Sequence, residues 1–187
     1  MTKAVHAQDQ QEPGIFRTLP GCPEGQDARV LAEYARELMR ADKVLVHIAR
    51  DDTRTAALKE LLTFFAPDVK VCVFPAWDCL PYDRVSPHPD ITAQRVAALV
   101  TLLSWQKEKV RHPRILLTTV NASVQRVTPK EVLQTGSLSA KSGDRLERED
   151  LEAFLQKNGY TRTQTVREAG DYAVRGGIVD LWPSGAE

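Results

Sequence analysis

Three short runs of continuous apolar residues constrain the fold of this chain more than any other feature. They occupy positions 43–49, 69–74 and 114–120, and a segment with helical character precedes each of them. A strand that is apolar along its whole length is typical of a parallel sheet with helices on both faces. The alternating helices provide the crossovers that parallel pairing requires. The sequence therefore predicts an α/β unit whose parallel sheet is covered by helices.

The helices that separate these strands are predicted at positions 26–41, 52–65 and 91–105. In the first of them, apolar side chains recur at helical spacing and form one stripe. Asp52 and Asp90 stand at the starts of the other two, where a short acidic side chain can accept a backbone N–H. We therefore expect Asp52 and Asp90 to be helix N-caps.

A second, smaller unit is predicted from residue 127 to residue 187, after a first unit that covers residues 15–126. The string TPKE at 128–131 matches a helix capping box, with Pro129 at the first helical position. Beyond it we expect a strand at 138–141, a helix at 148–157 closed by Gly159, and strands at 160–168 and 172–183. This α+β unit ends directly after a strand and is expected to be incomplete. Residues 1–14 are polar, show no pattern and are expected to be disordered or an expression remnant.

The charge and the cysteines exclude several classes of function. Lysine plus arginine and aspartate plus glutamate number 25 each, so the net charge is zero and strong independent binding to nucleic acid or an anionic membrane is not expected. No apolar run is long enough to cross a bilayer, which predicts a cytoplasmic protein without membrane contact. The three cysteines lack the spacing of a zinc site and are expected to be reduced, mostly buried thiols.

The loop GCPEGQDA at 21–28 invites comparison with a phosphate-binding loop, because it contains Gly21 and Gly25 directly before a helix. A working P-loop needs a lysine and a serine or threonine, and neither is present. Glu24 and Asp27 instead place carboxylates where a phosphate would lie. No histidine lies beside a nucleophile motif, so we predict a chain without catalytic residues, metal or cofactor. A nucleotide hydrolase or helicase fragment with weak DNA binding is the alternative.

A proline-rich connection at 74–95, FPAWDCLPYDRVSPHPDITAQR, separates the second strand from the third helix. Its simplest interpretation is a rigid link in which prolines restrict the backbone, while Trp77 and Tyr82 fix it to the body of the unit. As a string, however, the segment is highly distinctive.

A second distinctive string, REAGDYAVRGGIVDLWPSG, covers residues 167–185 and has Gly176 and Gly177 inside a predicted strand. Paired glycines at such a place predict a β-bulge. One extra residue there would turn Arg175 outward, to the face of Asp180 and Trp182. An exposed arginine beside an aromatic is typical of protein interfaces. A solvated arginine paired with Asp180 or Asp171 is the structural alternative.

Both strings resemble those of bacterial transcription-repair coupling factors (Mfd), whose N-terminal region is similar to the excision-repair protein UvrB. The resemblance runs from FPAWDCLPYD through SPHPDITAQR and TTVNASVQRV to GDYAVRGGIVDLWPSG, and it covers residues 15–187 in order. UvrB itself is a remote alternative, because UvrB keeps an intact phosphate-binding loop.

The resemblance implies a UvrB-like first unit without a functioning P-loop, followed by part of a UvrA-binding unit. Arg175 matches a UvrA-contacting arginine of the family, and we group Asp171 and Trp182 with it. A further arginine and a phenylalanine of that surface are expected beyond Glu187. The resemblance also places RNA polymerase binding, DNA binding and the ATP- and magnesium-dependent translocase downstream. The chain is therefore expected to be a non-catalytic module that recruits UvrA to stalled RNA polymerase.

Overall fold

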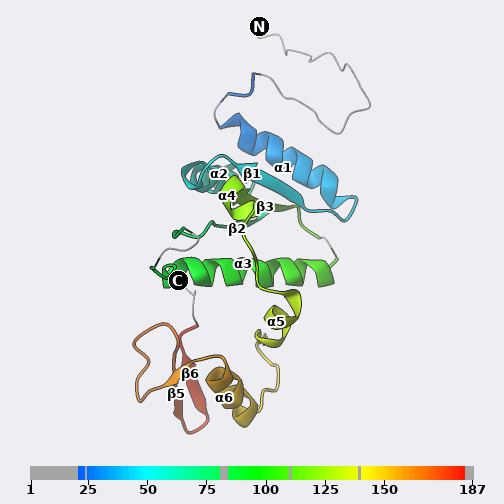
Figure 1. Cartoon of the computed structure of the whole chain (residues 1–187). Helices are drawn as coiled ribbons and strands as arrows, with labels where there is room; N and C mark the ends of the chain where they lie inside the picture. Colours follow the sequence, from blue (N-terminus) through cyan, green and yellow to red (C-terminus); the bar gives the residue numbers. More distant parts are fainter. Residues whose placement is uncertain (1–20, 24, 81–83, 110, 139, 184–187) are drawn as a thin grey trace.

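The computed structural model describes residues 21–183, except positions 24, 81–83, 110 and 139. The segment 1–14, which we expected to be disordered, lies outside the described residues, as do Glu24 and Tyr82. Two groups of elements are visible in Figure 1, one built on the strands β1 to β3 and one on the strands β4 to β6.

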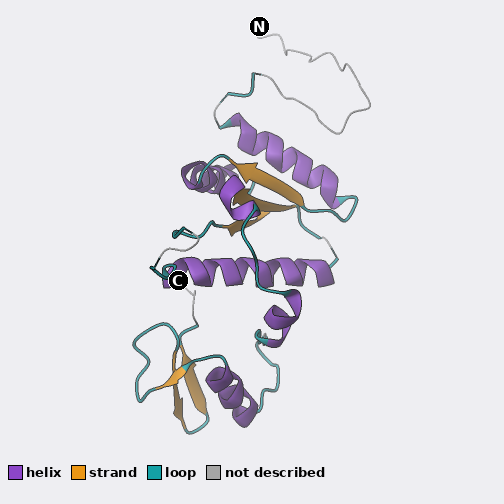
Figure 2. Ribbon diagram, viewed as in Figure 1, coloured by secondary structure: helices purple, strands orange, loops and turns teal. Residues whose placement is uncertain are grey.

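The first group is a parallel sheet between two layers of helices, as predicted. Its strands are β1 (Leu45–Ala49), β2 (Lys70–Phe74) and β3 (Arg114–Thr119), in the order β1-β3-β2 with both outer strands parallel to β3. Helices α1 (Gln26–Met39) and α2 (Asp52–Phe65) cover one face and α3 (Pro89–Lys107) covers the other (Figures 1 and 2). The short α4 (Val120–Ser123) follows the end of β3 directly, and its Ala122 joins the core on the α3 side. The α/β class is therefore confirmed.

Two of the predicted helix caps are wrong by one or two positions. The N-cap of α2 is Asp51, whose Oδ1 accepts the Arg54 N–H at 2.8 Å, and Asp52 is already helical. The N-cap of α3 is His88, whose Nδ1 accepts the Asp90 N–H at 3.3 Å. Pro89 occupies the first position of α3, where its missing N–H costs nothing, so Asp90 falls inside the first turn. In each case a second polar side chain lies within two positions of the predicted cap, and the backbone direction selected that one.

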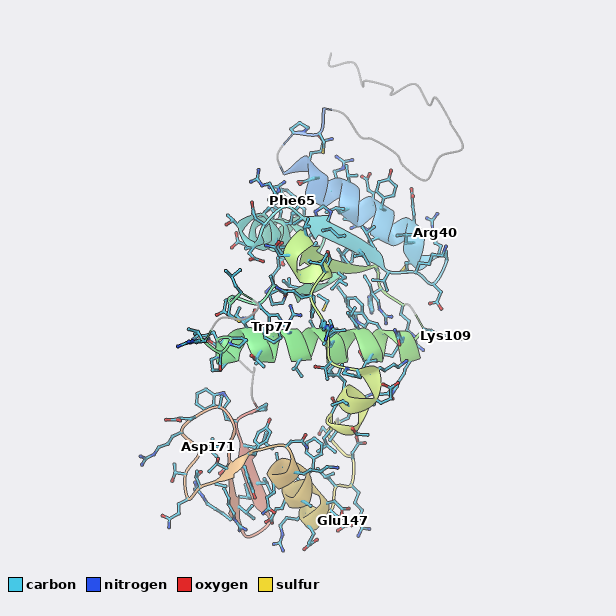
Figure 3. The ribbon with its side chains drawn as sticks, viewed as in Figure 1. Arg40, Phe65, Trp77, Lys109, Glu147 and Asp171 are labelled. Carbon is cyan, nitrogen blue, oxygen red and sulfur yellow. The ribbon has the colours of Figure 1, made fainter. Side chains whose placement is uncertain are left out.

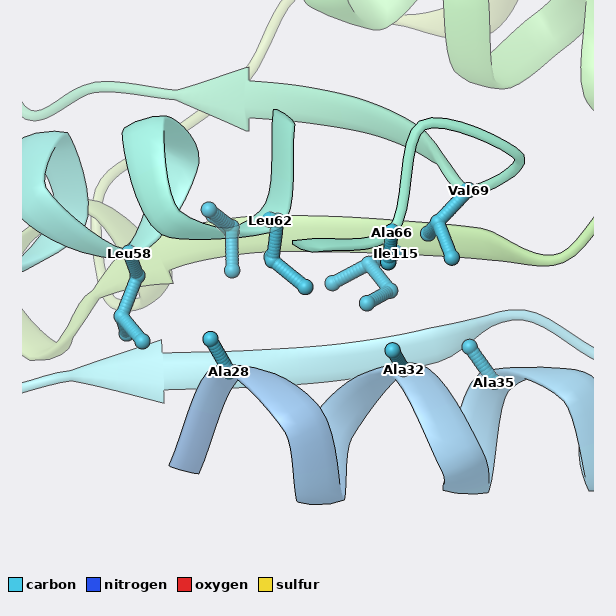
Figure 4. Close-up of a cluster of buried hydrophobic side chains, with 9 residues drawn as sticks. Ala28, Ala32, Ala35, Leu58, Leu62, Ala66, Val69 and Ile115 are labelled. Atoms are coloured by element: carbon cyan, nitrogen blue, oxygen red, sulfur yellow. The ribbon is translucent and has the colours of Figure 1, made fainter. Parts of the chain in front are cut away.

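Small side chains bring α1 close to the sheet. Ala28, Ala32 and Ala35 recur at helical spacing and are completely buried against α2 and β3 (Figure 4). Facing them are larger side chains of α2 and β3, of which Leu58, Leu62 and Ile115 are fully buried. Alternation of small and large residues across such a contact fills the space without voids. This cluster forms the larger of the two hydrophobic cores of the sheet.

On the opposite face, one buried arginine replaces much of the apolar packing. Arg95 of α3 is 2% exposed, and its guanidinium lies 4.2 Å from the ring centroids of both Phe74 and Trp77. It donates hydrogen bonds to the backbone oxygen of Pro75 and, at 3.0 Å, to Oε1 of Gln125. The same Gln125 oxygen accepts the Trp77 N–H at 2.9 Å. Trp77, labelled in Figure 3, thus fixes the proline-rich link, as the sequence indicated.

Replacement of Arg95 tests this arrangement. Arg95→Leu removes the donor of the Pro75 oxygen, one of the two donors of the Gln125 oxygen and both ring contacts, so we expect the free energy of unfolding in urea to fall by about 2–4 kcal/mol. Arg95→Lys keeps the charge, but an ammonium group is not planar and cannot stack on the two rings as a guanidinium does. We expect its loss of unfolding free energy to be intermediate. Arg29→Leu is the control, because the Arg29 side chain is 76% exposed. A loss for Arg95→Leu no larger than that of the control would contradict this role.

The second group combines two helices with a small mixed sheet. Helices α5 (Lys130–Thr135) and α6 (Arg148–Lys157) precede β4 (Thr161–Arg162), β5 (Asp171–Arg175) and β6 (Ile178–Leu181), which lie in the order β4-β5-β6. β4 is parallel to β5, and β6 is antiparallel to it. Tyr172 of β5 is fully buried and receives a hydrogen bond from Gln156 of α6 at 3.2 Å. Helix α6 therefore packs against the side of the sheet that carries Tyr172.

Predictions for this second group were correct for α6 and only partly correct elsewhere. Helix α6 ends at Lys157 and is closed as expected by Gly159, which has a φ of 82°. The Tyr160 N–H donates to the Leu155 oxygen at 3.0 Å, as in a Schellman motif. The capping box at 128–131 is wrong, because α5 begins after Pro129 and no side chain caps it. The strand at 138–141 is also wrong at its described positions, which are irregular, and the strand at 160–168 shrinks to β4. These segments lack the long apolar runs that made the first sheet predictable.

Candidate protein-docking site

The segment 171–182, predicted as one bulged strand, is a β-hairpin. Gly176 and Gly177 form its two-residue turn, and Arg175 pairs with Ile178 directly across it. Gly176 has a φ of 60°, as the first central residue of a type II′ turn requires. The predicted bulge is therefore wrong. Two glycines between alternating residues are typical of both features, and only the pairing of β5 with β6 distinguishes them.

Arg175 nevertheless lies where the bulge was expected to place it. Residues directly opposite in an antiparallel pair share a face, and the register pairs Ala173 with Asp180. Arg175 is therefore on the same face as Asp180, and its Nη2 lies 3.8 Å from the Asp180 Oδ2 and 3.3 Å from the Gln164 oxygen. Its side chain remains 59% exposed. The ion pair that we considered as the structural alternative exists, but an exposed pair of this kind contributes little stability.

Trp182 and Asp171 close the other end of the hairpin. The Trp182 N–H donates to the Asp171 oxygen at 3.0 Å, and the Trp182 oxygen accepts the Gly170 N–H at 2.8 Å. Trp182 is 42% exposed. The Asp171 Oδ2 accepts the backbone N–H groups of Arg167 and Glu168, both at 3.2 Å, so its carboxylate holds the turn that enters β5 (Figure 3 labels Asp171). The structure thus gives Asp171 a positioning role within the hairpin.

Sequence reasoning missed Ile178 as part of this surface. It is 64% exposed and lies directly across from Arg175, next to the turn. An interpretation of 172–183 as one strand placed Ile178 near the middle of an element, where an apolar side chain suggests burial. A hairpin signal, two glycines flanked by alternating residues, was available and would have placed it at the tip.

Substitutions at the two turn glycines test the hairpin. Gly176→Val places a β-branched residue at a positive φ, and we expect it to lower the free energy of unfolding by about 1–3 kcal/mol. Gly177→Ala is the matched control, because Gly177 has no φ in the left-handed region and nothing within 4 Å of an added Cβ. Urea denaturation of both variants is the measurement. Equal stabilities would indicate that the turn is not formed as described.

The glycine-bearing loop before α1 ends in an ion pair. Gly21 and Gly25 have positive φ values of 72° and 90°, and Gly25 occupies the N-cap position of α1. Asp27, in the first turn of α1, pairs with Arg54 of α2 and also accepts the Ala28 N–H at 3.0 Å. Its carboxylate therefore lies at the helix N-terminus that a phosphate-binding loop would offer to an anion.

His47 of β1 lies half-buried near this ion pair. Burial lowers the pKa of His47 below its ordinary value, Asp27 opposes the shift and Arg54 adds to it. No described helix is long and apolar enough to cross a membrane, and the described residues contain no cluster of three or more side chains suited to a metal. The cysteines are free, with Cys72 buried as expected and Cys22 exposed, contrary to expectation. Burial raises the pKa of the Cys72 thiol to about 11.

The lowered pKa of His47 predicts a pH-dependent stability. As the pH falls through 6.5, His47 is protonated in the unfolded chain before it is protonated in the folded chain. Unfolding then takes up a proton, so the free energy of unfolding should decrease from about pH 7.5 towards the folded-state pKa. His47→Gln should flatten this part of the curve, whereas the same slope in the variant and the parent would rule out His47 as its source. Urea denaturation at several pH values provides the test.

Comparisons with known proteins describe both parts of the chain. Residues 138–187 match the family model of the UvrB interaction domain. A transcription-repair-coupling factor of Haemophilus influenzae is 33% identical over 94% of this chain and 14% of its own length. Those of Escherichia coli and Rickettsia bellii are 36% and 28% identical over 86% and 73% of this chain, and over 13% and 12% of their own lengths. The chain thus spans about one seventh of these relatives.

Proposed function

Because this chain belongs to the family of transcription-repair-coupling factors, we propose that it is a non-catalytic docking module that binds the excision-repair protein UvrA. One observation carries the proposal: the β5–β6 hairpin, with its exposed Arg175, lies within the residues that match the UvrB interaction domain. Ile178, Asp180 and Trp182 share a face with Arg175, and we call these four residues the hairpin face.

The chemistry of the hairpin face suits a protein partner. An arginine, an aromatic and an exposed aliphatic side chain are the kinds of residue that anchor protein interfaces. The ion pair of Arg175 with Asp180 is long and solvent-exposed, so a carboxylate of UvrA can replace Asp180 at little cost. Asp171 contributes indirectly, since it holds the turn that sets the start of β5.

In this proposal, recruitment of UvrA to a stalled RNA polymerase needs parts of the full-length relatives that this chain does not contain. Binding of RNA polymerase and DNA, and ATP-driven translocation, are assigned to those parts. The alternative of a nucleotide-binding fragment is less favoured, because Asp27 and Arg54 are already paired at the N-terminus of α1. Saturable binding of ATP and magnesium by this chain would revive that alternative.

Titration calorimetry of the chain with purified UvrA tests the proposal. Arg175→Ala should weaken binding by about tenfold to a hundredfold, because loss of a charged hydrogen bond costs about 1.5–3 kcal/mol. Trp182→Ala should also weaken it. Arg145→Ala is the matched control, since the Arg145 side chain is 90% exposed in an ion pair elsewhere in the second group. An Arg175→Ala variant that folds and binds UvrA as tightly as the control would refute the assignment.

A further inference from the structure

The free edge of β2 forms the floor of an open groove between α2 and α3. β2 is an outer strand of the first sheet and pairs only with β3. The groove has a volume of about 610 Å³, and Val71, Cys72 and Val73 of β2 line it together with residues of both helices. It lies in the first group of elements and is separate from the hairpin face.

The backbone of β2 presents unpaired hydrogen-bonding groups to this groove. The Lys70 N–H donates to the Pro113 oxygen at 2.8 Å, so the backbone groups of Lys70 point towards the side of β2 where β3 lies. Alternate residues of a strand direct their backbone groups to opposite sides, which turns Val71 and Val73 towards the groove. Their two N–H and two C=O groups make no hydrogen bond to another described part of the chain. Such an edge is a template for one more strand.

The two walls of the groove leave room for the side chains of an added strand. α2 contributes Thr55 and Ala56, and α3 contributes Ala97 and Thr101, all of them small residues. Ala56 and Ala97 are exposed although they face the groove. The side chains of a strand alternate between the two faces of its sheet, so those of an added strand would point in turn towards α2 and towards α3. Short or β-branched side chains fit between these walls.

The charges along the groove differ between its two ends. Asp52, at the start of α2, and Asp78, after the end of β2, both line it near the carboxyl end of the strand. Lys59 lies seven residues further along α2, about 10 Å away at the rise of a helix. Asp52 and Lys59 are exposed, and neither forms an ion pair within the described ranges. One end of the groove therefore favours a basic side chain and its middle favours an acidic one.

We propose that this groove binds an extended segment of a partner protein, which adds a strand to the free edge of β2. The segment that fits has small or β-branched side chains and a lysine or arginine at the end that lies over Asp52 and Asp78. Main-chain hydrogen bonds to Val71 and Val73 supply affinity that does not depend on the sequence of the segment, and the basic residue supplies selectivity.

A synthetic peptide serves as the probe: lysine, then valine and threonine in alternation, then glutamate, blocked at both ends. We expect the chain to bind it saturably in a fluorescence anisotropy titration. The same peptide with N-methylated valines, which cannot complete the strand pairing, should bind at least about tenfold more weakly. A peptide with glutamate in place of the lysine should also bind more weakly, and increasingly so at low salt.

Variants that fill the groove locate the binding site. Ala56→Trp and Ala97→Trp should each weaken peptide binding by about tenfold or more. Ala153→Trp, on an exposed position of α6, is the matched control and should bind as the parent does. Circular dichroism of each variant establishes that it is folded, and Ala56→Leu replaces Ala56→Trp if the latter is not.

Three results would overturn the proposal. They are the absence of saturable binding to the parent chain, equal binding of the N-methylated peptide, and unchanged binding in the folded groove variants. Sedimentation of the chain alone over a range of concentrations tests whether a second copy of the chain occupies the groove instead. Self-association that Ala56→Trp abolishes, without peptide binding, would assign the edge to a second copy of the chain and refute a partner segment.

Discussion

The contact between Arg95 and the rings of Phe74 and Trp77 connects four parts of the described structure. It joins the end of β2, the start of the proline-rich link, the middle of α3 and, through Gln125, the segment that leads to the second group of elements. A guanidinium can do this because it is flat enough to lie between two rings while its edge donates several hydrogen bonds. An apolar side chain at position 95 would fill the space but would donate no hydrogen bond to the Pro75 or Gln125 oxygen.

This connection shapes the groove beside β2, whereas the hairpin face is held by other contacts. The proline-rich link lies over one end of the groove beside β2, and Trp77 and Asp78 are part of its lining. The segment from Gln125 onward leads to α5, which packs against α3 and donates a hydrogen bond from Lys130 to Gln106 at 3.0 Å. Beyond α5, contacts that the second group makes with its own residues hold the hairpin: the fully buried Tyr172 and the turn at Asp171. The two surfaces therefore depend on different local packing.

Local patterns were most reliable where burial is greatest. The strands β1, β2 and β3 were predicted from continuous apolar runs, because a strand covered on both faces leaves little choice of residue. Caps were less predictable: Asp51 and Asp52 are chemically equivalent, and only the direction in which the chain enters α2 decides which one accepts the N–H. The second group has few buried residues, so its short elements depend on their partners in space more than on their own pattern.

The sequence by itself determined the α/β class, the lack of a P-loop lysine and serine or threonine at positions 21–28, and the presence of an arginine, an aromatic and two glycines near residue 176. Those conclusions rest on residue type and spacing, which need no knowledge of distant contacts. The tertiary structure alone decided that the glycines turn the chain back on itself, that Arg175 therefore lies beside Ile178 and Asp180, and that Asp27 is paired with Arg54. The reason is physical: a glycine pair permits both a bulge and a turn at similar cost, and only the pairing of β6 with β5 favours the turn.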